Sequence, residues 1–374
     1  MRKVTPITLL TGYLGSGKTT LINHILQNEK GLKIAVIVND IGEVNIDASL
    51  IEKGGVVGKK EESLVALQNG CICCTLKMDL IEQIEEIVNM DKFDYIVIEA
   101  SGICEPIPIA QTITMLEDYI NTETLPSDVR LDSVITVTDA KRLSDEFDSG
   151  STLLNTKIDD EDIENLIIEQ LEFCNIVILN KVDEVDKGEL GRIKSVIKTL
   201  QPTAKIIETN YCKVDLKELL NTHLFDFEES ASSPGWIKYL ESPEDEEESE
   251  VDEYGIGTFV YFERNPFNRE KFFNYINKPW SKNIIRTKGI LYFSDDKSMS
   301  YLYEQAGTMK DLSDTGLWLI DELSPKELNK VLDQNPEIKK DWDPFYGDRM
   351  IKLVFIGQNL DKEQIKKELN ECLD

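Results

Sequence analysis

The sequence predicts an α/β fold, with a doubly wound, mostly parallel sheet in a first domain and a smaller α+β domain at the C-terminus. Three observations favour this fold class. Short continuous apolar runs alternate with segments that are long enough for crossover helices. A glycine-rich turn joins the first apolar run to the first predicted helix. An acidic stretch then separates this pattern from a second set of predicted strands and helices.

The first domain is predicted over residues 1–224. Its first strand is expected at Ile7–Thr11, and its first helix at Thr19–Gln27, where leucines and isoleucines recur at helical spacing. Further strands are predicted at Ile34–Val38, Tyr95–Ile98, Val134–Val137, Ile176–Leu179 and Ile206–Ile207. Runs without polar alternation are typical of parallel strands that are covered on both faces. We therefore expect helices on both sides of this sheet.

Residues 225–254 are predicted to form an acidic linker, because acidic residues, serine and proline predominate there. The second domain is predicted over residues 255–374. Its expected strands are Gly257–Phe262, Ile290–Phe293, Leu317–Ile320 and Leu353–Ile356. Its expected helices are Glu270–Ile276, Ser300–Ala306, Pro325–Leu332 and Lys362–Cys372. This pattern predicts a smaller antiparallel sheet.

The charge of the chain excludes several classes of partner. A formal net charge of −29 repels nucleic acid and anionic lipid. The N-terminal apolar run is too short for a signal peptide, and no later run approaches the roughly 18 apolar residues of a membrane span. The odd number of cysteines, 7, argues for reduced thiols. We expect a cytoplasmic protein that binds neither nucleic acid nor membrane.

The glycine-rich turn at residues 12–19 fits the phosphate-binding pattern G-x-x-x-x-G-K-[ST], between a predicted strand and a predicted helix. Glycines let backbone N–H groups turn toward a phosphate, and the helix N-terminus adds partial positive charge. Lys18 is expected to bridge the β- and γ-phosphates, and Thr19 to ligate Mg²⁺. The predicted phosphate-binding residues are Gly12, Gly15, Ser16, Gly17, Lys18, Thr19 and Thr20.

A second nucleotide motif, N-K-x-D, follows the run Ile176–Leu179 as Asn180, Lys181 and Asp183. Ligands bind at the carboxyl ends of strands in sheets of this kind. An aspartate there can accept hydrogen bonds from both the ring N1–H and the exocyclic amine of guanine. Adenine does not offer this donor pair, so GTP is the predicted nucleotide.

A third segment, Glu99-Ala-Ser-Gly102, follows the run Tyr95–Ile98 at the position of an acidic residue that supports Mg²⁺ and the attacking water. We predict Lys18 and Glu99 as the catalytic residues, and the Gly102 N–H as a γ-phosphate contact. Asn39–Glu43 is a candidate first switch; the alternative is a plain strand-ending turn.

Three cysteines lie within four residues, as Cys71, Cys73 and Cys74, behind an Asn-Gly turn. Soft thiolates favour zinc, cobalt or copper(I) over magnesium or calcium. Three ligands leave a tetrahedral ion one short, which suits a metal that must leave. Glu43, Cys104 or a residue of a client could complete the site. The alternative is three buried, inert cysteines.

Together these motifs resemble the CobW-type metal-handling P-loop GTPases. The resemblance extends into the second domain at Arg264–Phe267, Arg286–Gly289, Gln305–Gly307 and Gly347–Arg349. It implies a GTP-dependent metallochaperone, with Mg²⁺ and GTP ordering the cysteine loop and hydrolysis releasing metal to a client metalloprotein of unknown identity. Zinc is the commonest implied cargo, and cobalt is the second.

Three alternatives stay open at this point. The chain could be a regulatory GTP switch with a permanent structural zinc, or a cobalt chaperone for cobalamin synthesis. It could also be a small-molecule kinase, although Asn180–Asp183 argues against that, because a kinase needs no guanine-reading motif.

Overall fold

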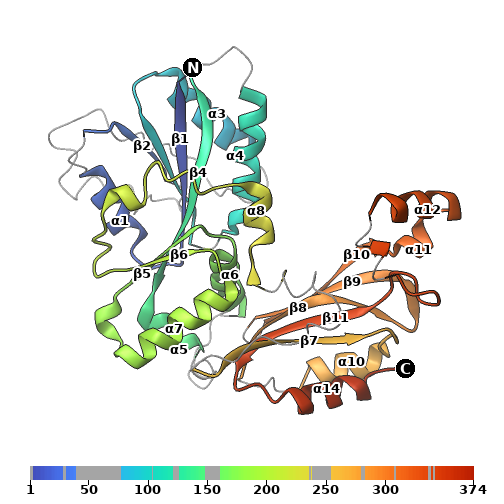
Figure 1. Cartoon of the computed structure of the whole chain (residues 1–374). Helices are drawn as coiled ribbons and strands as arrows, with labels where there is room; N and C mark the ends of the chain where they lie inside the picture. The colour runs from blue at the N-terminus through green and yellow to red at the C-terminus, as the bar shows by residue number, and fades with distance from the viewer. Residues whose placement is uncertain are drawn as a thin grey trace. The chain divides into compact units, whose positions relative to one another are not determined.

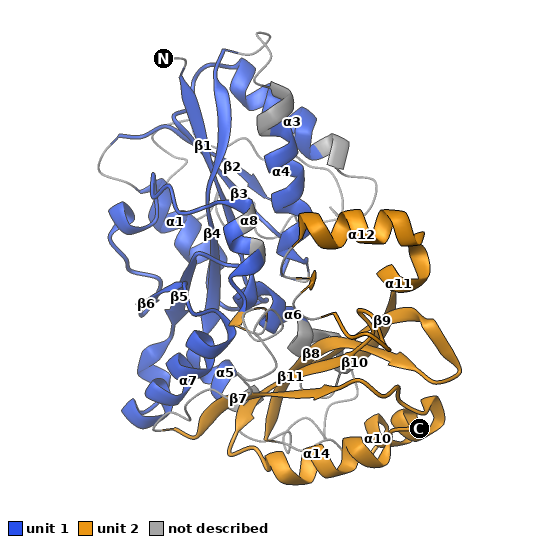
Figure 2. Ribbon diagram, turned by 45° about the vertical axis from the view of Figure 1, so that its right-hand side comes forward, with its two compact units in different colours: residues 1–145, 166–234 blue, residues 146–165, 235–374 orange. Residues whose placement is uncertain are grey.

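The protein is described from a computed structural model. The described residues are 3–27, 31–38, 77–102, 104–120, 126–147, 161–235, 237, 254–278, 283–306, 309–335, 338–339 and 342–374. The chain divides into two compact units, residues 1–145 with 166–234 and residues 146–165 with 235–374 (Figure 2). Each unit has its own sheet. None of the helices within these ranges is long and apolar enough to cross a membrane.

The first unit contains a six-stranded sheet in the order β2-β3-β1-β4-β5-β6, in which each neighbouring pair is parallel (Figure 1). The strands are β1 (Val4–Thr11), β2 (Ile34–Val38), β3 (Tyr95–Glu99), β4 (Asp128–Asp139), β5 (Ile176–Asn180) and β6 (Lys205–Glu208). The predicted doubly wound parallel sheet is therefore confirmed. Its strand residues are almost entirely buried in β2, β3 and β5, which explains their unbroken apolar runs.

The helices of this part of the chain connect the parallel strands, except the last one, which follows β6. They are α1 (Lys18–Leu26), α3 (Lys77–Asn89), α4 (Pro106–Ile120), α5 (Ala140–Phe147), α6 (Glu161–Glu172), α7 (Lys187–Leu200) and α8 (Phe227–Ser232). Short 3₁₀ helices form at η2 (Val182–Glu184) and η3 (Leu216–Glu218). Because every strand runs the same way, the loops that carry the predicted nucleotide motifs emerge at one edge of the sheet.

Helix α8 lies within the range predicted as an acidic linker. The rings of Phe225 and Phe227 both meet Phe173, at centroid distances of 6.3 and 6.2 Å. Aromatic contacts of this kind stabilise packing beyond the area that they bury. The first unit accordingly continues through Pro234, past residue 224, where the first domain is predicted to end.

The second unit contains a five-stranded antiparallel sheet in the order β10-β9-β8-β11-β7. The strands are β7 (Ile256–Glu263), β8 (Ile284–Phe293), β9 (Asp296–Ala306), β10 (Met309–Leu317) and β11 (Ile351–Gln358). The helices are α10 (Arg269–Ile276), α11 (Leu319–Glu322), α12 (Pro325–Gln334) and α14 (Lys362–Glu371). Helices α10 and α14 lie side by side and share an aromatic core with the sheet (Figures 1 and 2). The predicted smaller α+β domain with an antiparallel sheet is confirmed.

Two predicted elements of this unit are wrong. Ser300–Ala306 was expected to be helical, but it belongs to β9, where buried Tyr303 alternates with partly exposed neighbours at strand period. Leu317–Ile320 was expected to be a strand, but β10 ends at Leu317 and α11 follows. The Asp348 carboxylate accepts hydrogen bonds from the backbone N–H groups of Leu319 and Ile320, at 2.7 and 3.1 Å. This distant side chain caps α11, so local sequence could not reveal the helix.

Candidate functional site

The predicted nucleotide motifs meet at the carboxyl edge of the parallel sheet. The phosphate-binding loop follows β1, Glu99 ends β3, and Asn180 ends β5. Strand β1 lies next to β3, with Leu10 opposite Glu99. Strand β4 lies between β1 and β5. The structure thus brings together three motifs that are up to 171 residues apart in the sequence, counting from Gly12 to Asp183.

The glycines of the phosphate-binding loop have the backbone conformation that only glycine adopts easily. Gly12, Gly15 and Gly17 have φ values of 135°, 80° and 116°. A Cβ atom on Gly12 would lie 2.2 Å from the Val137 carbonyl oxygen. A Cβ on Gly17 would lie 2.6 Å from the Asn180 amide nitrogen. Two of these glycines are therefore required by close contacts as well as by conformation.

The start of α1 fits an anion. Gly17 precedes the helix and provides no side-chain cap for its first N–H groups, which are the groups that bind phosphate at helix N-termini. The Lys18 ammonium is buried and donates a 2.7 Å hydrogen bond to the Gly12 carbonyl oxygen, so that it lies across the loop. The Ser16 hydroxyl is buried and has no hydrogen-bond partner among the described residues. These features suit a bound phosphate group.

The segment after β3 bonds to β1 and lies close to the phosphate-binding loop. The Ala100 N–H donates to the Leu10 carbonyl oxygen at 2.9 Å, and Glu99 is buried beside it. A Cβ on Gly102 would lie 2.9 Å from the Leu14 backbone nitrogen and 3.0 Å from its Cγ. A movement of Gly102 would therefore displace the phosphate-binding loop. Such coupling is needed if Gly102 contacts the γ-phosphate and distinguishes GTP from GDP.

Asn180 connects β5 to the phosphate-binding loop. Its side-chain amide donates to the Ser16 carbonyl oxygen at 2.9 Å. Its side-chain oxygen accepts from the Cys212 N–H at 3.1 Å and from the Thr209 hydroxyl at 3.3 Å. Asn180 is thus fully engaged with protein groups. Asp183 is exposed, which leaves its carboxylate accessible to a base.

Sequence reasoning missed Cys212, which follows β6 at the same edge. It is buried, has a φ of 52°, and donates a weak 3.5 Å hydrogen bond from Sγ to the Gly17 carbonyl oxygen. Burial raises the pKa of the Cys212 thiol to about 12, so it stays protonated. Its place five residues after Ile207, in the loop that follows this apolar run, is the signal that could have identified it.

The predicted transition-metal residues Cys71, Cys73, Cys74 and Glu43, and the candidate switch at residues 39–43, lie outside the described residues. Cys104 is described: it is buried, and its backbone bonds to Ser101 and Gln170. Within the described ranges, no group of three or more His, Cys, Asp and Glu residues could hold a metal ion. The metal site stays a prediction.

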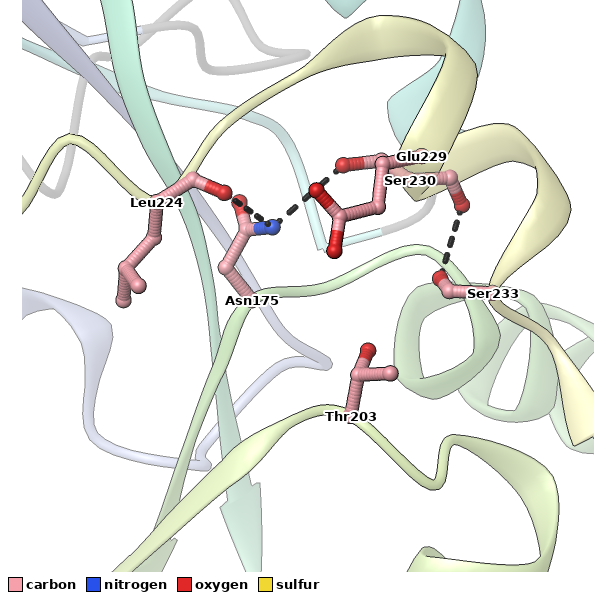
Figure 3. Close-up of a pocket in the computed structure, with 6 residues that line it drawn as sticks. All are labelled: Asn175, Thr203, Leu224, Glu229, Ser230 and Ser233. Carbon is pink, nitrogen blue, oxygen red and sulfur yellow. Dashed lines mark hydrogen bonds between the residues drawn. The ribbon is translucent and has the colours of Figure 1, made fainter.

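A cavity of about 80 Å³ lies away from these motifs, beside the start of β5 (Figure 3). It is lined by Asn175, Thr203, Leu224, Glu229, Ser230 and Ser233. The Asn175 amide donates to the Leu224 carbonyl oxygen and to the Ser230 hydroxyl, and its oxygen accepts from the Val134 N–H. These bonds join α8 and the preceding segment to the sheet, which indicates a structural role.

Family comparisons agree with this geometry. Residues 6–208 match the CobW/HypB/UreG nucleotide-binding domain, and residues 256–373 match the cobalamin synthesis protein cobW C-terminal domain. The chain belongs to the CobW family. As a member of the CobW/HypB/UreG group, it is a P-loop GTPase. The resemblance predicted from the motifs is therefore confirmed.

Relatives match over different lengths. The zinc-regulated GTPase metalloprotein activator 1 of Dictyostelium discoideum is 39% identical over 98% of this chain and 79% of the relative. The zinc chaperone CobW of a Sinorhizobium species is 33% identical over 51% of this chain and 55% of the relative. The Zn(II)-bound YjiA GTPase from E. coli covers 99% of both chains, at 19% identity and a TM-score of 0.41. At that score, the fold assignment rests on the strand order described above.

Proposed function

We propose that this CobW-family GTPase is a GTP-dependent metallochaperone that carries zinc at Cys71, Cys73 and Cys74 and releases it to a client metalloprotein. The observation that supports this most is that the three cysteines lie within the nucleotide-binding domain, between the phosphate-binding loop and Glu99. A relative that is alignable over 98% of the chain is a zinc-regulated GTPase metalloprotein activator. Cobalt is the second candidate cargo.

GTP would be bound by the residues at the carboxyl edge of the parallel sheet. Lys18 would exchange the Gly12 carbonyl oxygen for β- and γ-phosphate oxygens. Thr19 would hold Mg²⁺, which when bound neutralises charge on those oxygens. Glu99 would orient the attacking water, and Asp183 would accept from the guanine N1–H and amine.

Zinc delivery would depend on a difference in zinc affinity between the GTP-bound and GDP-bound states. Three thiolates hold zinc incompletely, so a small movement of one ligand changes affinity strongly. Gly102 packs against Leu14, and a γ-phosphate contact at Gly102 would separate the GTP and GDP states. A ligand shifts such an equilibrium only by its differential affinity for the two states. Zinc affinity must therefore depend on the nucleotide.

A zinc competition titration tests the proposal. Reduced full-length protein is loaded with Mg²⁺ and either GDP or a non-hydrolysable GTP analogue. We expect zinc affinity to rise by about two orders of magnitude with the analogue, which is near the upper end of the usual range of coupling free energies. The triple change of Cys71, Cys73 and Cys74 to Ser should abolish binding.

Cys372→Ser is the matched control, because Cys372 is buried in the second unit and lies against α10. Its zinc affinity should equal that of the wild type. Equal zinc affinity in the GDP and GTP states would contradict the chaperone proposal and would favour a GTP switch with a structural zinc. Repeating the titration with Cys104→Ser shows whether Cys104 supplies the fourth ligand.

A further inference from the structure

A chain of contacts crosses the carboxyl end of β4, between the phosphate-binding loop and the N-K-x-D motif. Strand β4 separates β1 from β5, and Asp139, its last residue, lies opposite Asn180. Lys181 therefore emerges next to Asp139. Asp139 itself belongs to none of the sequence motifs from which the site was predicted, although its partner Lys181 does.

The Asp139 carboxylate holds two elements at once. One oxygen forms an ion pair with the Lys181 ammonium. The other accepts hydrogen bonds from the backbone N–H groups of Lys141 and Arg142, at 2.9 and 3.2 Å, in the first turn of α5. The side chains of Asp139 and Lys181 are 14% and 33% exposed, so water screens their attraction only in part.

Helix α5 carries the contact on to the phosphate-binding loop. The Arg142 guanidinium carbon lies 3.9 Å from the centroid of the Tyr13 ring, within the range of a cation–π interaction. Tyr13 follows Gly12 directly in that loop. One carboxylate therefore connects to Lys181 on one side and, through Arg142, to the loop on the other.

We propose that Asp139 is a positioning residue that sets the guanine-reading motif against the phosphate-binding loop, and so determines selectivity for guanine. Lys181 has a φ of 57°, a left-handed conformation that a lysine adopts only when contacts hold it there. Asp183 follows two residues later, and the direction of the chain at Lys181 decides where its carboxylate lies. This role rests on the proposed function of Asn180–Asp183 as the guanine-reading motif.

Asp139→Asn isolates the ion pair. The asparagine oxygen still caps α5, while the charge that holds Lys181 is removed. The test measures binding of GDP, IDP and ADP to the full chain; IDP lacks the exocyclic amine. We expect the affinity for GDP to fall about five- to tenfold. The affinity for IDP should fall less, because Asp183 can accept only from the ring N1–H of IDP and so has less to lose when it is displaced. The ratio of GDP affinity to IDP affinity should therefore decrease.

Lys181→Met and the double variant provide the second measurement. If Asp139 acts through Lys181, the Asp139→Asn change should have little further effect on GDP affinity in Lys181→Met. Asp91→Asn is the matched control: Asp91 pairs with Lys3 at 3.0 Å, at the opposite edge of the sheet. Its affinities for GDP and IDP should equal those of the wild type.

The proposal is overturned if Asp139→Asn keeps the wild-type affinities for GDP and IDP, or if its effect adds fully to that of Lys181→Met. A wild-type chain that binds ADP as tightly as GDP would instead overturn the guanine-reading motif itself. The two failures are therefore distinguishable.

Discussion

The two edges of the parallel sheet are built in opposite ways. At the carboxyl edge, glycines with positive φ form the phosphate-binding loop, the Ser16 hydroxyl has no partner among the described residues, and Asp183 is exposed. Toward the amino ends of the strands, the side chain of Asp132 is fully buried in β4. Its oxygens accept hydrogen bonds from Tyr95 OH, from the Thr222 N–H and hydroxyl, from the His223 N–H and from Arg130.

Polar groups therefore serve different purposes at the two ends of the strands. Around Asp132, polar groups bind one another and hold the segment after η3, so their loss should damage stability. At the carboxyl edge, polar groups are held in place but left for a ligand, so their loss should damage binding. A change near Asp132 that weakened binding alone, or a change at the carboxyl edge that weakened stability alone, would contradict this division.

Asp132→Ala should have the largest effect. Removing the carboxylate leaves the buried Tyr95 hydroxyl and several partly buried donors without this acceptor, and we expect a loss of about 3–5 kcal/mol in the free energy of unfolding. Urea unfolding measures it. The affinity of the folded variant for GDP should stay within about twofold of the wild type. A large loss of GDP affinity with unchanged stability would contradict the assignment of Asp132 to stability.

Gly12→Ala should mirror that result at the carboxyl edge. The new Cβ would meet the Val137 carbonyl oxygen, so the loop must shift, and we expect about a hundredfold loss of GDP affinity. Isothermal titration measures it. Gly31→Ala is the matched control, because Gly31 also has a positive φ, 70°, but its Cβ would meet nothing within 4 Å. That control should lose about 1 kcal/mol of stability from strain and keep its GDP affinity.

One buried thiol at each end of the strands, Cys174 and Cys212, should make the protein less stable at alkaline pH. Burial raises the pKa of Cys174 and of Cys212 to about 12. In the unfolded chain these thiols ionise from about pH 8.5, while the folded chain keeps their protons. Stability from this source is complete below pH 8.5 and decreases as pH rises toward 12, by about 1.4 kcal/mol per pH unit for each thiol.

Urea unfolding at pH 8 and pH 10 measures this slope. Cys212→Ala and Cys174→Ala should each reduce the slope by the contribution of the thiol that is removed. Each variant should also be less stable than the wild type at pH 8. An unchanged slope in either variant would show that the thiol is not buried as described.

The smallest effect is expected at the exposed Lys3–Asp91 pair. Their side chains are 43% and 62% exposed, so solvent screens the pair. Asp91→Asn should change the free energy of unfolding by less than about 0.5 kcal/mol. Thermal unfolding measures this change. A loss of about 2 kcal/mol would mean that position at the end of the strands, and not burial, determines how much a polar pair contributes to stability.

The residues at strand ends are predictable from sequence, because an apolar run followed by a motif determines both the strand and the side of the sheet. The phosphate-binding loop, Glu99 and Asn180 were found in this way. Asp139 and Asp132 were not, because their partners Lys181 and Thr222 are 42 and 90 residues away. Only the strand order shows such pairs.

The second unit shows the same limit in its secondary structure. The capping of α11 by Asp348 is tertiary, and β9 becomes a strand through pairing with β8 and β10. Patterns of a few residues do not contain that pairing. The cysteine cluster lies outside the described residues, so its role stays a prediction.

The central place of β1 affects how the protein forms during synthesis. Ile7 pairs with Ile96 of β3 and Leu131 of β4, and the Asn180 bond to Ser16 spans 164 residues. At ribosomal rates of roughly 5–20 residues per second, Asn180 follows Ser16 by roughly 8–33 seconds. A nascent chain thus carries its phosphate-binding residues long before it can form the Asn180 bond to their loop.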